Sequence, residues 1–171
     1  MEALVNIRSA IHWEPGLIHM QGRKMSSQWS YAHDLVNMYL GIAHLADNEL
    51  DPEEQRTFLL KFRQWMPDIP TQDFEQVWSE VLSLYQSLGS RQDRYALYLQ
   101  SAVNIAQFMG ENKEGLKSII RDLVDIAGAD GKLHENEVTM IKAAAISYGL
   151  SADVRLNVKT GRVELTLQEA N

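Results

Sequence analysis

The chain has 171 residues, 45% of them hydrophobic, and this size predicts one compact domain with a single core. Its formal net charge of −7 argues against a nucleic-acid partner, because phosphate contacts need a basic surface. It contains no cysteine, which excludes disulfides, thiol chemistry and thiolate metal sites.

The sequence predicts a soluble, cytoplasmic protein. No stretch approaches the roughly 18 consecutive apolar residues that a membrane-spanning helix needs. The first sixteen residues carry Glu2, Arg8 and Glu14 and lack the continuous apolar segment of a signal peptide.

Residues 1–25 are predicted to form an N-terminal arm. Breakers and polar residues at 14–16 and 21–27 enclose only a short apolar piece, so this segment is set apart from the helical region after it. The first dozen residues are compatible with either a helix or a strand.

Residues 27–150 are predicted to form a helical domain, because their apolar residues recur with the period of an α-helix. Asp51 is the predicted N-cap of the second helix, with Pro52 in the first turn and Glu54 completing a capping box. Thr71 and Ser90 are predicted to cap the next two helices. A fifth helix is predicted from about Leu116 and a sixth from near His134.

Residues 151–171 are predicted to form a β-hairpin and a tail, because apolar and polar residues alternate there. A turn at Thr160-Gly161 would place Val158 opposite Val163, although a longer loop is also compatible with the sequence. A lone hairpin is marginally stable in water, so its apolar face should cover the helical body or meet a partner. The predicted fold is therefore all-α, with six to seven helices and an appended C-terminal β-hairpin.

An acidic octet occurs twice, as "DNELDPEE" at residues 47–54 and as "DGKLHENE" at residues 130–137. The apolar residues before the octets match at an offset of 84, pairing Leu35 with Ile119, and those after them match at 83, pairing Trp65 with Tyr148. This repetition predicts two pseudo-symmetric helix–turn–helix halves. Two amphipathic hairpins can also resemble each other by chance.

Each octet resembles the second part of an EF-hand calcium loop, which needs Asp, a sharp turn, a carbonyl ligand and a distal Glu. In the second octet these places hold Asp130, Gly131, the Lys132 carbonyl and Glu137. The earlier ligand places hold no carboxylate, which excludes a complete EF-hand. The remaining half-site predicts a weak site for a hard divalent cation: calcium, magnesium or manganese.

The first octet offers the same half-site, with Asp47 and Glu54 as the carboxylates and Asn48 at the turn. Asp51 and His134 are candidate additional donors in the first and second octets. The alternative is purely structural, because Asp caps a helix start and Glu in a first turn favours the helix dipole. The candidate metal ligands are Asp47, Asp51, Glu54, Asp130, His134 and Glu137.

The segments "IAHLADNELDPEE" and "IAGADGKLHENE" resemble the paired acidic motifs of the TerB-like tellurite-resistance family, over residues 29–150. That family is related to the N-terminal domain of a membrane-anchored DnaJ-type co-chaperone. The resemblance implies an all-helical fold in two halves, divalent-cation binding, and a link to stress and toxic-oxyanion resistance. The family's acidic positions fall on Asp47, Glu54, Asp130 and Glu137. Asn48 in place of Gly, and Lys132 with His134, depart from the family pattern.

The predicted function is a non-enzymatic module that binds a divalent cation and acts through other proteins, with a membrane-associated stress complex among the candidate partners. The alternative is a metal-free scaffold, or a homo-oligomer associating through the hairpin, in which the octets serve only as helix caps. An enzyme using paired carboxylates ranks last, because exposed carboxylates at helix starts are ordinary unless a pocket shifts their pKa. No catalytic residue or organic cofactor is predicted.

Overall fold

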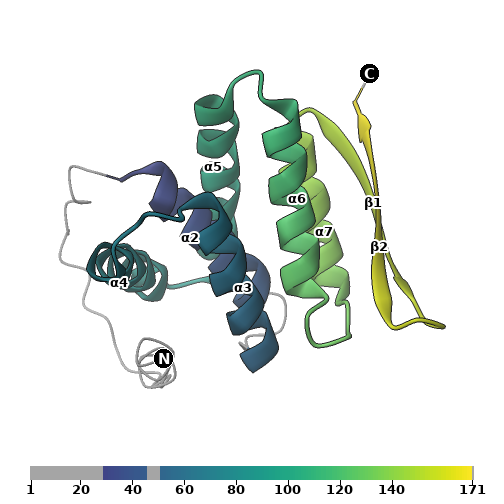
Figure 1. Cartoon of the computed structure of the whole chain (residues 1–171), viewed down its shortest axis with the longest axis horizontal. Helices are drawn as coiled ribbons and strands as arrows, with labels where there is room; N and C mark the ends of the chain where they lie inside the picture. Colours follow the sequence, from purple (N-terminus) through teal and green to yellow (C-terminus); the bar gives the residue numbers. More distant parts are fainter. Residues whose placement is uncertain (1–28, 46–50, 171) are drawn as a thin grey trace.

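The computed structural model describes residues 29–45 and 51–170 (Figure 1). The predicted arm, residues 1–25, and the candidate ligand Asp47 lie outside them. The described elements are α2 (Tyr31–Leu45), α3 (Pro52–Trp65), α4 (Thr71–Ser87), α5 (Arg91–Met109), α6 (Lys113–Ala127), α7 (Glu135–Ser147), β1 (Leu150–Asn157) and β2 (Arg162–Glu169). Six helices and an antiparallel hairpin within the described ranges confirm the predicted fold class.

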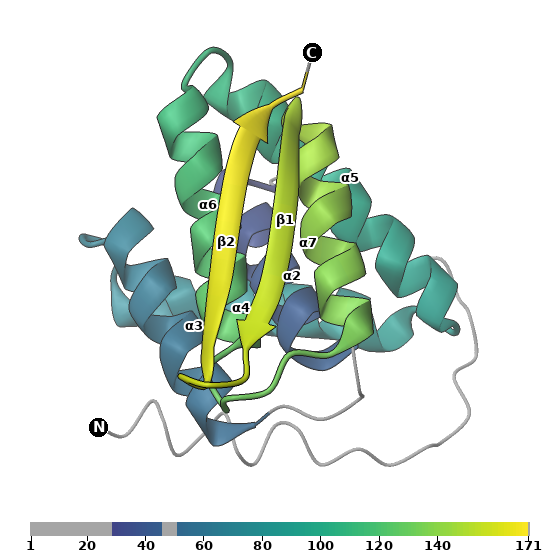
Figure 2. The same cartoon turned by 90° about the vertical axis from the view of Figure 1, so that its right-hand side faces the viewer.

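Helix α2 lies at the centre of the helical body, and the other described helices surround it (Figures 1 and 2). Every residue of α2 after Tyr31 is buried. The surrounding helices bury only one face each, as amphipathic surface helices do. The core is therefore built around one fully enclosed helix.

The capping box predicted for α3 is confirmed. Asp51 Oδ1 accepts the Glu53 N–H at 2.8 Å, and Glu54 Oε2 accepts the Asp51 N–H at 3.0 Å. Ser90 also caps α5 as predicted, with its Oγ accepting the Asp93 N–H at 3.0 Å. These bonds satisfy backbone donors that have no partner inside a helix.

Two predicted helix starts were wrong by one to three residues. Pro70 is the N-cap of α4 and makes no side-chain cap, so Thr71 is the first helical residue and not the cap. Helix α6 begins at Lys113 instead of Leu116, because Asn112 Oδ1 accepts the Gly115 N–H at 2.9 Å and supplies an earlier cap.

The two halves, α2–α3 and α6–α7, interlock through equivalent contacts. Trp65 at the end of α3 donates its indole N–H to Asp122 on α6 at 2.7 Å. Tyr148, which follows α7, places its hydroxyl 3.4 Å from Met38 Sδ on α2. Trp65 and Tyr148 are equivalent at the offset of 83, and Met38 and Asp122 at 84. Each half therefore ends against the first helix of the other, as expected of pseudo-symmetric halves.

The predicted pairing of the hairpin was wrong by two residues. Val163 pairs with Leu156, and Leu165 pairs with Val154, which leaves Val158 in the loop with 86% of its surface exposed. The longer loop forms because Asn157 Oδ1 accepts the backbone N–H groups of the two residues after Val158.

The inner face of the hairpin covers the helical body. Leu150, Ala152 and Val154 are buried in the same core as the helices, and the hairpin lies as an outer layer over α6 and α7 (Figure 2). The hairpin approaches α6 closely at Gly128, where a Cβ would lie 2.6 Å from Val163 Cγ2. The hairpin therefore rests directly on the start of the second acidic turn.

We expect Gly128→Ala to lower the free energy of unfolding by about 1–2 kcal/mol, because the added methyl overlaps the stiff Val163 side chain. Urea denaturation measures this loss. The control is Gly89→Ala, since a Cβ at Gly89 meets no atom within 4 Å. Adding Val163→Ala to Gly128→Ala should make the two changes non-additive, and full additivity would contradict the contact.

Candidate functional site

The second acidic turn connects α6 to α7 and is fully described. Gly131 has a φ of 80°, a conformation that favours glycine and reverses the chain sharply. Asp130 Oδ1 accepts the Lys132 N–H at 2.8 Å, and Asp130 Oδ2 lies 3.3 Å from Lys132 Nζ. The Asp130 carboxylate thus closes the turn with one oxygen and holds a side-chain ammonium with the other.

Glu137 faces the interior at the start of α7. It is buried, and its Oε2 accepts the backbone N–H of His134, the N-cap residue, at 2.6 Å. A carboxylate at a helix N-terminus is stabilised by the helix dipole and by unpaired N–H groups. Glu137 therefore fixes the direction in which the chain enters α7.

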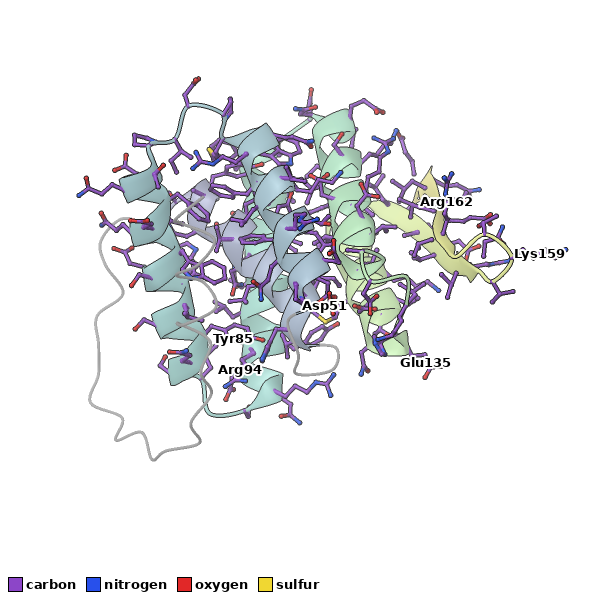
Figure 3. The ribbon with its side chains drawn as sticks, turned by 60° about the horizontal axis from the view of Figure 1, so that its bottom comes forward. Asp51, Tyr85, Arg94, Glu135, Lys159 and Arg162 are labelled. Atoms are coloured by element: carbon purple, nitrogen blue, oxygen red, sulfur yellow. The ribbon has the colours of Figure 1, made fainter. Side chains whose placement is uncertain are left out.

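The first acidic turn is described only from Asp51 onward, so the predicted ligand Asp47 is not placed. Glu54, the equivalent of Glu137, is likewise buried and likewise accepts the N–H of its N-cap residue, Asp51. Figure 3 labels Asp51 at the start of α3 and Glu135 at the start of α7. The duplicated glutamates thus perform the same local task in both halves.

Among the described candidate ligands, the structure pairs Asp51 with Glu54 and His134 with Glu137, each through a backbone N–H of the first residue. Within residues 29–45 and 51–170, no three or more His, Asp or Glu side chains are grouped so that they could hold a metal ion. The donors present at the second turn, the Asp130 carboxylate and backbone carbonyls, are of the hard-oxygen type that calcium, magnesium and manganese accept. They match the chemistry of the half-site, with Lys132 already occupying one oxygen.

A buried carboxylate that sequence reasoning missed lies between the two halves. Asp122 on α6 accepts the hydroxyl of Tyr39 at 2.8 Å and the indole N–H of Trp65 at 2.7 Å, both at Oδ2. Its Oδ1 lies 3.2 Å from Lys61 Nζ, which also contacts the more exposed Asp125. We call Asp122, Tyr39, Trp65 and Lys61 the Asp122 cluster.

The Asp122 cluster affects the protonation of its members. Burial, followed by the Asp122 charge, raises the pKa of the Tyr39 hydroxyl well above its usual value. Burial alone would lower the pKa of the Lys61 ammonium, but hydrogen bonds to Asp125 and Asp122 raise it above its ordinary value. Tyr39 therefore stays a neutral donor and Lys61 a cation, and both hold the Asp122 carboxylate.

A signal for this cluster was present in the sequence. Asp122 follows Ile119 by three residues and precedes Leu123, so it falls on the apolar stripe of α6, and Lys61 falls between Phe58 and Trp65 on α3. A charged residue on each of two apolar stripes indicates a buried pair, because unpaired buried charges are costly.

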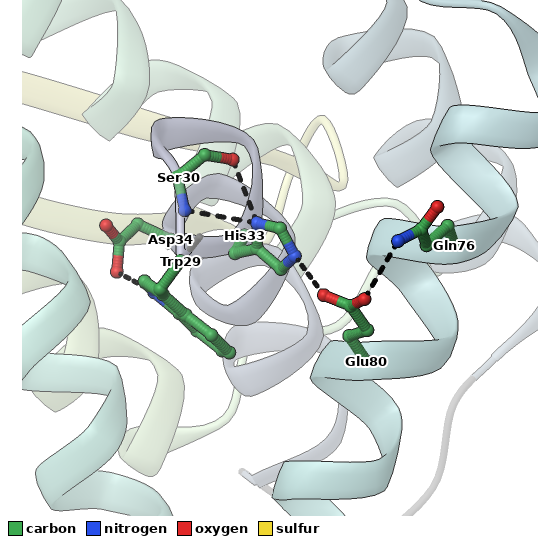
Figure 4. A network of polar contacts seen from close by, with 6 residues as sticks. All are labelled: Trp29, Ser30, His33, Asp34, Gln76 and Glu80. Atoms are coloured by element: carbon green, nitrogen blue, oxygen red, sulfur yellow. Dashed lines mark hydrogen bonds and ion pairs between the residues drawn. The ribbon is translucent and has the colours of Figure 1, made fainter. Parts of the chain in front are cut away.

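His33 joins α2 to α4 through a second polar network (Figure 4). Its Nδ1 lies 3.2 Å from the Ser30 backbone N–H, which can only donate, so Nδ1 is the acceptor. Nε2 then carries the proton toward Glu80, 2.8 Å away, and Gln76 binds the other Glu80 oxygen. His33 thus serves as a helix cap and an interhelical link. His44 is also packed, with Nδ1 3.0 Å from the Tyr85 hydroxyl.

These features define the class: a small helical module with duplicated acidic turns. None of its described helices has the length and apolar character to cross a membrane. The family model described as Tellurite resistance protein TerB matches residues 33–159, which is more than half of the chain. The chain belongs to the TerB family. No curated protein and no solved structure matches it.

We expect Asp122→Ala to lower the free energy of unfolding by about 3 kcal/mol, because it leaves the Tyr39 and Trp65 donors and the Lys61 charge without their acceptor. Asp125→Ala is the matched control, because Asp125 is a second carboxylate partner of Lys61 but lies at an exposed site. Its loss should lower the free energy of unfolding by at most about 1 kcal/mol. Equal losses in urea denaturation would rule out a special role for the buried cluster.

Proposed function

We propose that this TerB-family protein is a non-enzymatic, cytoplasmic stress-response module that binds a divalent cation at its acidic turns and acts through other proteins. The observation that carries the proposal is the Asp130 carboxylate, which lies on a sharp Gly131 turn and already holds a positive charge. A hard cation prefers carboxylate and carbonyl oxygens presented by such a turn.

Lys132 supports this proposal because its side-chain ammonium shows that the Asp130 carboxylate can hold a positive charge at the place where a free cation would bind. Its side chain is 71% exposed and reaches Asp130 Oδ2 at 3.3 Å, so a divalent ion can displace it without moving the backbone. Where the second octet has Lys132 and His134, the first octet has Glu49 and Asp51. The first turn therefore carries more negative charge and is the stronger candidate for the ion.

The alternative is that the octets act only as helix caps in a metal-free scaffold or homo-oligomer. It is favoured by the buried Glu54 and Glu137, whose carboxylates each accept a backbone N–H at a helix start. These bonds stabilise the fold whether or not an ion binds. Substituting the aspartates distinguishes the two functions. In the proposed function Asp47 and Asp130 bind the ion, whereas Glu54 and Glu137 cap their helices under either function.

We expect calcium, magnesium or manganese to give a binding heat with the full chain, and Asp47→Ala/Asp130→Ala to abolish it, because both turns then lack their leading carboxylate. Isothermal titration calorimetry measures the heat, and the shift in unfolding temperature provides a second readout.

The control is Glu53→Ala/Glu135→Ala, which removes the same charge from the first turns of the same two helices and should keep the heat. If the wild-type chain gave neither heat nor a thermal shift with any of the three ions, the cation would be excluded and the capping alternative would stand.

The same site predicts a gain of affinity. In an Asp47→Ala background, where only the second turn can respond, we expect Lys132→Glu to tighten cation binding roughly tenfold, because it removes the competing ammonium and adds a carboxylate. Lys142→Glu makes the same charge change on the exposed side of α7 and is the control. Equal effects of the two substitutions in calorimetry would mean that only net charge matters.

A further inference from the structure

The turn of the hairpin is exposed and positively charged. It comprises residues 158–162, "VKTGR", all of which are exposed, and it carries Lys159 and Arg162 without an acidic residue. Val158 is 86% exposed, more than any other large hydrophobic residue in the part of the chain that the structure describes. We call residues 158–162 the hairpin tip.

The two cations of the hairpin tip are unpaired. Other lysine and arginine side chains within residues 29–45 and 51–170 contact a carboxylate, a carbonyl, a hydroxyl or an aromatic ring. Among described residues, only Lys142, Lys159 and Arg162 have a basic side chain without such a partner. Unpaired positive charge is therefore concentrated at the hairpin tip.

Asn157 holds the hairpin tip in one shape. Its carbonyl accepts the Gly161 N–H at 2.8 Å, and its Oδ1 accepts the Lys159 N–H at 3.0 Å. Its amide donates to Glu164 at 2.7 Å, which engages the first carboxylate after the tip. A loop that is fixed in advance loses little conformational entropy on binding, so even weak contacts are not offset by the cost of ordering it.

The hairpin tip projects away from the helices (Figure 1), and Figure 3 labels Lys159 and Arg162 on the part of the hairpin that lies beyond them. The chain carries a formal charge of −7 and the tip contributes +2, so the remainder carries −9. An anionic surface therefore attracts the tip and repels the rest of the chain. Because salt screens exposed charges over roughly 8–10 Å, the attraction is strongest when the tip approaches first.

A bilayer with anionic lipids offers partners for both features of the hairpin tip. Its phosphate groups attract the lysine and arginine side chains, and the hydrocarbon directly beneath them accepts an apolar side chain such as Val158. An acidic patch on a soluble protein supplies the negative charge alone, whereas the bilayer has an apolar layer next to it. The combination of charge and exposed valine therefore favours a lipid surface.

We propose that the hairpin tip contacts an anionic lipid bilayer, with Lys159 and Arg162 at the phosphate groups and Val158 inserted beneath them. The contact is weak, because two cations and one valine bind less strongly than a covalent lipid chain, which itself holds only reversibly. It orients the protein on the membrane surface and does not anchor it. The contact is separate from the acidic turns and does not depend on the proposed cation.

The test uses the full chain with Val158→Trp, because tryptophan reports insertion and strengthens a weak interfacial contact. In EDTA, vesicles of phosphatidylglycerol and phosphatidylcholine should shift the added fluorescence to shorter wavelength. Vesicles of phosphatidylcholine alone, or soluble glycerol phosphate, should give no shift, and high salt should abolish it. Leu60→Trp is the matched control without a shift, since Leu60 is also apolar and is 61% exposed, but lies on α3.

Adding Lys159→Glu/Arg162→Glu should lower the affinity for the anionic vesicles by about thirtyfold or more, because each cation near the surface contributes to binding. Arg56→Glu/Lys142→Glu makes the same charge change at exposed positions on α3 and α7, and should lower the affinity by no more than about threefold. Equal losses in the two double variants would overturn the proposal, because only net charge would then matter.

Val158→Asp tests the native side chain without a reporter. It should reduce co-sedimentation of the otherwise unchanged chain with the anionic vesicles at high lipid concentration. The absence of any shift for Val158→Trp, an equal shift with neutral vesicles, or an equal shift from Leu60→Trp would each overturn the proposal.

Discussion

The enclosure of α2 is the constraint on which the rest of the structure depends. A helix buried on all sides must offer apolar contact around its whole circumference, and a polar group on it is costly unless it finds a partner within the protein. Helix α2 carries His33, Asp34, Asn37, Tyr39 and His44. Their hydrogen-bond partners on three of the surrounding helices include Glu80 and Tyr85 on α4, Ser101 and Asn104 on α5, and Asp122 on α6. Polar contacts therefore specify which helix packs on which side, because apolar packing alone is not directional.

The close approach of α5 to α2 adds a steric requirement. At Gly41 on α2, a Cβ would lie 2.8 Å from the Tyr98 ring on α5.

This enclosure also explains why the carboxylates of the acidic octets differ in environment. Both turns follow a helix of the central body and start a helix that packs against it, so the side chain at the third helical position faces inward. Glu54 and Glu137 occupy that position and are buried against backbone N–H groups. Asp130, before its helix, closes the surface turn and contacts Lys132. The second octet thus combines a buried glutamate that caps a helix with a half-buried aspartate that closes the turn beside Lys132.

Much of the fold was predictable because, in the helices, the capping residues and the spacing of apolar residues in the sequence indicate the same structure. Helical periodicity located all six described helices, and Asp51-Pro52 with Glu54 signalled the start of α3 from local chemistry alone. The hairpin register was not predictable from alternation, because Asn157 competes for backbone donors and lengthens the loop by two residues on the first strand. The Asp122 cluster was missed because its members come from three helices distant in the sequence, and the pairing appears only after α3 packs on α6. At the candidate site, residue types were readable, but whether a carboxylate faces inward or outward depends on the neighbouring helix.

The two halves share a plan but differ where they touch each other and at their turns. At the equivalent interhelical contacts, one half places Asp122 against Trp65, and the other places Met38 against Tyr148. At the turns, Glu49 and Asp51 stand where the second half has Lys132 and His134. The second turn is also covered by the hairpin at Gly128. The second turn, which carries Lys132 and His134 and lies under the hairpin, is therefore under constraints that its sequence alone does not reveal. Similar sequence therefore does not imply equal cation affinity, and variants of Asp47 and Asp130 are informative only when each is measured separately as well as together.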